Sequence, residues 1–216
     1  MSVSELLSRL QITLQQIRSQ LDEIDQLREK CFELSRKLVR QCSTAIKHVH
    51  RGERSEAEVA LREAGAMASE LSEIASVYPE VSSWGFVQDA QREFAEAALF
   101  FAIALGDVLP ALDDLKVTGV AYINGLAEAM GELRRLILSK LGDGDVESAR
   151  ELVSIMEGVY YELLPFDHPD AITLGLRRRV DQLRHSLERT KEDLTLTLQC
   201  AALLQSLKRT ASGGAH

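Results

Sequence analysis

The sequence contains few of the residues that interrupt helices, with 4 prolines and 13 glycines among its 216 residues. It also has almost none of the β-branched alternation that is typical of half-buried strands. Long stretches are instead rich in Leu, Ala, Glu, Arg and Gln, which favour helices. These features predict an all-α protein.

Long apolar runs and clustered cysteines are absent as well. No apolar segment approaches the roughly 20 residues that a membrane span needs, and the first residues do not resemble a secretory signal. Cys31, Cys42 and Cys200 lie far apart and form no CxxC pair, so neither a zinc site nor a disulfide framework is expected. We therefore expect a cytoplasmic protein that does not act at a membrane.

The charge balance is acidic. There are 25 Lys and Arg residues against 33 Asp and Glu residues, which gives a net charge of −8. With 45% hydrophobic and 27% charged residues, the chain has the composition of a folded domain rather than a disordered one. The acidic balance argues mildly against nucleic acid as a partner, because binding to phosphates needs local positive charge. The distribution of charge along the chain therefore matters more than its sum.

Apolar residues recur at steps of three or four from Leu10 to Leu38, which predicts one helix from near the start to about His50. A helix of ~50 residues would be ~75 Å long. A compact chain of this size cannot cover that length, so part of the apolar stripe is expected to contact another subunit. The alternative is a mobile, coiled-coil-like N-terminal hairpin.

Start and stop signals predict five further helices. Ser55 with Glu58 forms a capping box, Ser82 or Ser83 is a second N-cap, and Asp145 is a third. The expected helices cover residues 55–77, 83–105, 114–141, 146–165 and 169–207. Because no longer linker interrupts the pattern, residues 1–208 are expected to form one all-α domain, followed by a flexible tail over 209–216.

Two predicted helices carry carboxylates within apolar surroundings. Glu93 and Glu96 lie three residues apart, directly before the all-apolar segment 97–105. Glu128 and Glu132 lie four residues apart and are the only charged residues of segment 119–132. Like charges at this spacing repel each other, and burial favours their protonated forms unless a cation joins them.

A hard divalent cation, Mg²⁺ or Mn²⁺, explains these four carboxylates, since such ions prefer oxygen ligands and can activate water for attack on a phosphodiester. We therefore predict Glu93, Glu96, Glu128 and Glu132 as both metal ligands and catalytic residues. The alternative is a set of surface salt bridges in which Arg92 pairs with Glu96, and Arg135 pairs with Glu132.

Positive charge gathers at the end of the first helix, where acidic residues are scarce. A second concentration comprises residues 177–179 together with Arg184 and Arg189. Either cluster is suited to holding phosphate oxygens, whereas the alternative for both is a solvated helix face. The predicted nucleic-acid-binding residues are Arg36, Lys37, Arg40, Lys47, His50 and Arg51.

Three segments carry a resemblance to a known family: residues 34–36 (LSR) with 47–51 (KHVHR), residues 91–97 (QREFAEA) and residues 125–133 (GLAEAMGEL). In this order and spacing they resemble the translin superfamily, and more specifically translin-associated factor X (TRAX) and its archaeal homologues. The connection between the third and fourth predicted helices is short, which is similar to the archaeal members.

The resemblance implies a bundle of six to seven helices that assembles into a hollow homo-octamer. It also implies a Mg²⁺-dependent endoribonuclease that cleaves single-stranded RNA within the shell. The family's catalytic carboxylates fall on the four glutamates named above, with Glu128 standing where the family has Asp. The alternative is a non-catalytic, translin-like protein that binds single-stranded RNA or DNA.

Overall fold

The computed structural model describes residues 2–213, which contain helices and no strand. The all-α prediction is therefore confirmed. Six helices are long, α4 and α7 are single turns, and Pro79–Ser83 form a short 3₁₀ helix. The α-helices are α1 (Val3–His50), α2 (Arg54–Val77), α3 (Gly85–Leu105), α4 (Leu112–Leu115), α5 (Gly119–Gly142), α6 (Val146–Leu163), α7 (Asp170–Thr173) and α8 (Leu176–Gly213).

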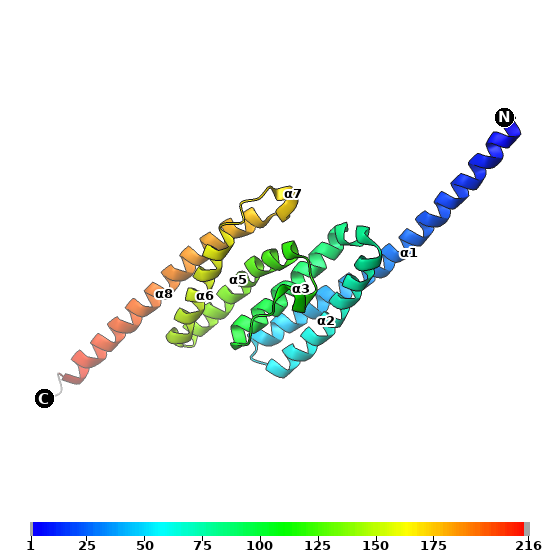
Figure 1. Cartoon of the computed structure of the whole chain (residues 1–216). Coiled ribbons are helices and arrows are strands. Elements are labelled where there is room, and N and C mark those ends of the chain that lie inside the picture. Colours follow the sequence, from blue (N-terminus) through cyan, green and yellow to red (C-terminus); the bar gives the residue numbers. More distant parts are fainter. Residues whose placement is uncertain (1, 214–216) are drawn as a thin grey trace.

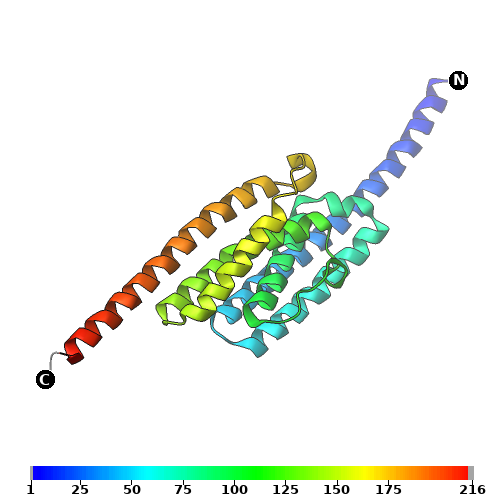
Figure 2. The same cartoon turned by 60° about the vertical axis from the view of Figure 1, so that its left-hand side comes forward.

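The long helices pack side by side in an elongated bundle (Figures 1 and 2). Helix α1 packs against α2 and α3, α3 packs against α5, and α5 packs against α6 and α8. The free ends of α1 and α8 project from opposite ends of this bundle (Figure 1). The apolar side chains between Val3 and Ile24 are 40–76% exposed, and the first fully buried residue of α1 is Cys31. As predicted, the chain alone does not cover its first helix.

Two of the three predicted N-caps are wrong. Gly52 adopts a left-handed conformation that ends α1 and turns the chain at once, so α2 begins at Arg54 and its N-cap is Glu53 rather than Ser55. Ser82 and Ser83 lie in the 3₁₀ helix, and Trp84 is the N-cap of α3. Asp145 is confirmed as the cap of α6, since its carboxylate accepts a hydrogen bond of 3.3 Å from the Ser148 amide.

The fourth and sixth predicted helices are each divided in two, for a physical reason that periodicity does not reveal. Lys116 adopts a left-handed conformation that ends α4, and the Thr118 hydroxyl then caps α5. Leu174 and Gly175 are both left-handed and separate α7 from α8. Helix α8 continues to Gly213, through the start of the predicted tail over 209–216. Residues 214–216 lie outside the described residues, and the flexibility of this tail stays a prediction.

Between residues 2 and 213, no helix combines the length and apolar character that a membrane span needs. All three cysteines are free thiols, with Cys31 and Cys42 buried and Cys200 exposed. The cytoplasmic location stays a prediction.

Helices α3 and α5 approach each other closely at Gly125 of α5. A Cβ atom at this position would lie 2.7 Å from the Arg92 carbonyl oxygen, 2.7 Å from the Ala95 Cβ atom and 2.8 Å from the Glu96 amide nitrogen. Only glycine permits backbone contact this close. The contact fixes α5 against the segment of α3 that carries Glu93 and Glu96.

We therefore expect Gly125→Ala to destabilise the fold by about 1–3 kcal/mol, because the added methyl group must separate two packed helices. Urea unfolding measures this change. Gly131→Ala is the matched control, since a Cβ atom there meets nothing within 4 Å. The control is expected to be as stable as the unchanged protein or up to about 1 kcal/mol more stable. Equal effects of the two substitutions would contradict the proposed contact.

Candidate functional site

The four predicted carboxylates lie on the two helices that meet at Gly125. Glu93 and Glu96 belong to α3, whereas Glu128 and Glu132 belong to α5. Glu93, Glu96 and Glu128 line a cleft of about 890 Å³, whose other wall is helix α8. Glu132 is close enough to raise the pKa of Glu96 by charge repulsion. The structure thus brings the four glutamates into one acidic cluster.

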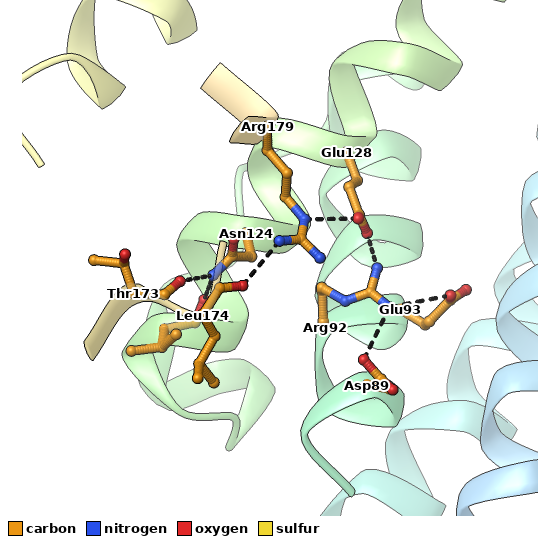
Figure 3. A network of polar contacts seen from close by, with 9 residues as sticks. Asp89, Arg92, Glu93, Asn124, Glu128, Thr173, Leu174 and Arg179 are labelled. Carbon is orange, nitrogen blue, oxygen red and sulfur yellow. Dashed lines mark hydrogen bonds and ion pairs between the residues drawn. The ribbon is translucent and has the colours of Figure 1, made fainter. Parts of the chain in front are cut away.

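Two guanidinium groups hold Glu128 (Figure 3). Arg92 donates to Oε2 of Glu128 from α3, and Arg179 donates from α8 to Oε1 at 2.8 Å. The second terminal nitrogen of Arg92 also lies 3.2 Å from Asp89 and 3.6 Å from Glu93. The pair of Arg92 with Glu96 that the alternative interpretation requires is therefore absent. Arg92 instead links Glu128 to the carboxylates of its own helix.

The same network reaches the turn between α7 and α8 (Figure 3). Arg179 donates to the Leu174 carbonyl oxygen at 3.0 Å, and Asn124 donates to the Thr173 carbonyl oxygen at 2.8 Å. The left-handed conformations of Leu174 and Gly175 make this turn possible. The turn therefore positions Arg179 over the acidic cluster.

Glu132 has different partners. Its Oε2 atom lies 2.6 Å from Nε2 of His50 and 2.8 Å from Nη1 of Arg135. The predicted pair of Arg135 with Glu132 is present. The ring of His50 also packs against the ring of Phe100, with 5.0 Å between the two ring centroids. His50, which the sequence predicts as a nucleic-acid ligand, is thus largely buried beside one of the predicted catalytic carboxylates.

Glu96 is the carboxylate without a partner. It is half-buried and makes no hydrogen bond or ion pair to any described residue from 2 to 213. Burial, together with the charges of Glu128, Glu93 and Glu132, raises the pKa of Glu96 to about 8. Burial also raises the pKa of Glu93, although Arg92 opposes this shift. The charge of Arg92 opposes the rise in the pKa of Glu96 as well, but Arg92 forms no ion pair with this carboxylate.

The donor set fits a hard divalent ion in its chemistry, since carboxylate oxygens are the ligands that Mg²⁺ and Mn²⁺ prefer. The orphaned carboxyl of Glu96 is the observation that supports the fit. Within the described part of the chain, however, no three His, Cys, Asp or Glu side chains converge closely enough to hold a metal ion. Arg92 and Arg179 bind both carboxylate oxygens of Glu128 in this arrangement. Metal binding by the four glutamates therefore stays a prediction.

The predicted basic residues of α1 form an exposed strip that excludes His50. Arg36, Arg40 and Lys47 line a groove between α1 and α3. Lys37 is exposed and does not line this groove, and Nη1 of Arg51 lies 4.0 Å from Oε2 of Glu53. Among the described residues, no carboxylate forms an ion pair with Arg36, Lys37, Arg40 or Lys47. These four cations remain available to phosphate oxygens.

The second basic cluster lies across the cleft on α8. Arg179 and Arg189 line the cleft, whereas Arg177, Arg178 and Arg184 are exposed outside it. The sequence alone does not assign Arg92 to the site, and it presents Arg179 only as one member of a basic cluster. Their convergence on Glu128 joins three helices, and only the proximity of Arg92 to Glu93 is visible in the sequence.

The raised pKa of Glu96 predicts a pH-dependent stability. Its pKa is 4.5 in the unfolded chain and about 8 in the folded one, so the folded state keeps a proton that the unfolded state releases between these values. Stability should therefore fall as the pH rises through this window. Glu96→Gln should be about 1–2 kcal/mol more stable than the unchanged protein at pH 8, and similar to it near pH 4.5.

Urea unfolding at several pH values checks this prediction. The exposed Glu151 of α6 gives the control Glu151→Gln, for which we expect no comparable change with pH. A stability difference for Glu96→Gln that is the same at pH 5 and pH 8 would disprove the assigned pKa.

Comparison with known proteins gives concordant results. The sequence profile of the translin family matches residues 90–198. An uncharacterized protein of Methanocaldococcus jannaschii is 30% identical over 191 residues, which cover 88% of this chain and 84% of the relative. Among solved structures, AfC3PO in complex with duplex RNA has a TM-score of 0.81 and 33% identity, over 87% of this chain and 97% of that chain.

A second match is the crystal structure of apo-NeC3PO, with a TM-score of 0.78 over 85% of this chain and 96% of that chain. At 19% identity, this likeness shows the fold alone. The family profile and the relative of M. jannaschii agree with the sequence resemblance and with the observed bundle. The chain therefore belongs to the translin family.

Proposed function

We propose that this protein is a TRAX-like endoribonuclease that depends on Mg²⁺ or Mn²⁺ and cleaves single-stranded RNA. The observation that carries the proposal is the acidic cluster, which contains a half-buried carboxyl without a partner and lies between two basic helix faces. The faces belong to α1 and α8, on either side of α3 and α5. The likeness to AfC3PO, which has been solved with duplex RNA, supports RNA as the ligand.

In this proposal Glu93, Glu96 and Glu128 hold the divalent ion, with Glu132 beside them. When bound, the ion supplies Lewis acidity and an activated water molecule. A cation at the cluster favours the ionised form of Glu96, whose pKa of about 8 otherwise keeps it protonated at neutral pH. Arg92 and Arg179 border the same cleft and are suited to binding the phosphodiester oxygens bidentately. The basic residues of α1 bind phosphates further along the strand.

The assembly proposed for this function is a hollow homo-oligomer, an octamer by family resemblance. Its support is the apolar stripe of α1, which stays exposed from Val3 to Ile24. A second exposed apolar region lies on the projecting end of α8 and includes Leu196, Leu203 and Leu204. Surfaces of this kind are typical of protein–protein contacts.

A second candidate is a non-catalytic protein that binds single-stranded RNA or DNA, as translin does by family resemblance. The observation that favours it is the state of Glu128, whose charge is already neutralised by two arginines. In that case the arginines are permanent structural partners, and the cleft binds nucleic acid without cutting it.

Cleavage of a labelled single-stranded RNA distinguishes the two candidates. The unchanged protein should cut the RNA with Mg²⁺ or Mn²⁺ and not with EDTA. The double substitution Glu128→Gln/Glu132→Gln should slow cleavage by about 100-fold or more, because one metal ligand and the negative charge of the carboxylate beside the ion are lost. The control is Glu151→Gln, which should cut normally. Equal rates for the double variant and the unchanged protein would eliminate the catalytic assignment, and binding without any cleavage would select the second candidate.

Substitution of Arg92 tests whether its guanidinium competes with the metal. Arg92→Gln frees Oε2 of Glu128, so the affinity for Mn²⁺ should rise about tenfold, which corresponds to loss of one competing ion pair. Titration calorimetry measures the affinity. Arg134→Gln is the matched control, because Arg134 pairs with Asp193 outside the cluster. Weaker Mn²⁺ binding in Arg92→Gln would show that the arginine supports the site instead.

A further inference from the structure

A second cavity opens beside the acidic cluster, between α1 and α3, which lie side by side in the bundle (Figures 1 and 2). Its volume is about 490 Å³. Phe32 and Val39 of α1 and Phe86 of α3 form its apolar surface. A cavity of this size and lining is suited to one flat organic ring system rather than to an ion. We call it the α1–α3 groove.

Each phenylalanine ring of the α1–α3 groove has a guanidinium group beside it, one from Arg36 in the groove lining and one from Arg28 outside the lining. Phe32 and Phe86 meet edge to face, with their ring centroids 5.3 Å apart. The guanidinium carbon of Arg36 lies 5.8 Å from the centroid of the Phe32 ring, and that of Arg28 lies 5.9 Å from the centroid of the Phe86 ring. Aromatic rings interleaved with cations are typical of surfaces that stack nucleobases and bind the phosphates between them.

The Ser35 side chain adds a polar feature to this apolar lining. Ser35 is 3% exposed, and its hydroxyl has no hydrogen-bond partner among the described residues. Ser35 lines the groove, but its Oγ atom is enclosed by neighbouring side chains, so a ligand reaches this hydroxyl only when those side chains move apart. An unpartnered buried hydroxyl is unfavourable, and a ligand with a hydrogen-bonding edge would satisfy it.

The charges at the rim indicate which kind of molecule carries the ring. Arg36, Arg40 and Lys47 line the groove without a carboxylate partner, so they are complementary to an anion. Asp89 also lines the groove and is bound by Arg92 of the acidic cluster. An ion pair between Asp89 and Arg92 therefore connects the groove with the acidic cluster.

We propose that the α1–α3 groove binds an unpaired nucleobase of the RNA strand whose backbone crosses the acidic cluster. The base packs against Phe32 and Phe86 and hydrogen-bonds the Ser35 hydroxyl, while the rim cations bind the adjacent phosphates. This inference rests on the proposed function and adds a requirement for a base that is not paired. It gives Ser35, in the LSR segment, a direct role in ligand binding.

The test compares two oligonucleotides that differ only in their bases. One is a single-stranded RNA, and the other has the same length of sugar-phosphate chain without bases. Fluorescence anisotropy in EDTA measures both affinities with the full-length protein. The unchanged protein should bind the RNA at least about tenfold more tightly than the abasic chain.

Variants then locate the effect. Phe86→Leu removes a ring but retains an apolar side chain, and it should bring the ratio of the two affinities close to one. Ser35→Ala changes the side-chain volume little, so it tests the groove even if Phe86→Leu does not fold. It should reduce the ratio of the two affinities several-fold. Phe166→Leu is the matched control, since Phe166 lies outside the groove, and it should leave the ratio unchanged. Arg36→Gln/Arg40→Gln should weaken binding of both oligonucleotides equally and reduce its salt dependence.

The outcomes separate the two proposals. Equal binding of RNA and abasic chain by the unchanged protein would overturn the base-binding groove but leave the proposed nuclease intact. A tenfold ratio that neither Phe86→Leu nor Ser35→Ala reduces would place the base elsewhere and also overturn it. Failure to bind either oligonucleotide would remove the proposed function together with this inference.

Discussion

The backbone contact between α3 and α5 at Gly125 determines where every proposed functional carboxylate lies. A side chain of any size at this position would meet the backbone of Arg92 and Glu96. The short approach places two pairs of glutamates on adjoining helix surfaces, although the nearest members of the two pairs, Glu96 and Glu128, are 32 residues apart in the chain. The long outer helices α1 and α8 then add positive charge on both sides of that acidic cluster.

The electrostatics of the cluster follow from this packing. Glu93, Glu96 and Glu128 share a partly dry cleft with Arg92 and Arg179. Arginines form ion pairs with Glu128 and, beside the cleft, with Glu132, but none pairs with Glu96. The remaining repulsion and burial keep the pKa of Glu96 near 8. An acidic protein thereby combines a site that favours a cation with helix faces that favour phosphates, which the net charge of −8 does not reveal.

The sequence predicts most of the fold because the helices are long and strongly periodic. It also predicts that four glutamates share a site, since each pair interrupts an otherwise apolar helix. It does not predict the left-handed turns at Lys116 and Leu174, because neither residue type favours that conformation. Nor does it predict that Arg92 binds Glu128 rather than Glu96, since that choice depends on how two distant segments cross. His50 lies beside Glu132 for the same reason.

Anomalous diffraction from a crystal soaked in Mn²⁺ reveals whether Glu93, Glu96 and Glu128 hold a divalent ion. We predict a manganese peak between α3 and α5, coordinated by oxygens of these three glutamates, with the Arg92 guanidinium moved away from Glu128. A map without a peak at the cluster, in a soaked crystal where Arg92 still binds Glu128, would contradict the account.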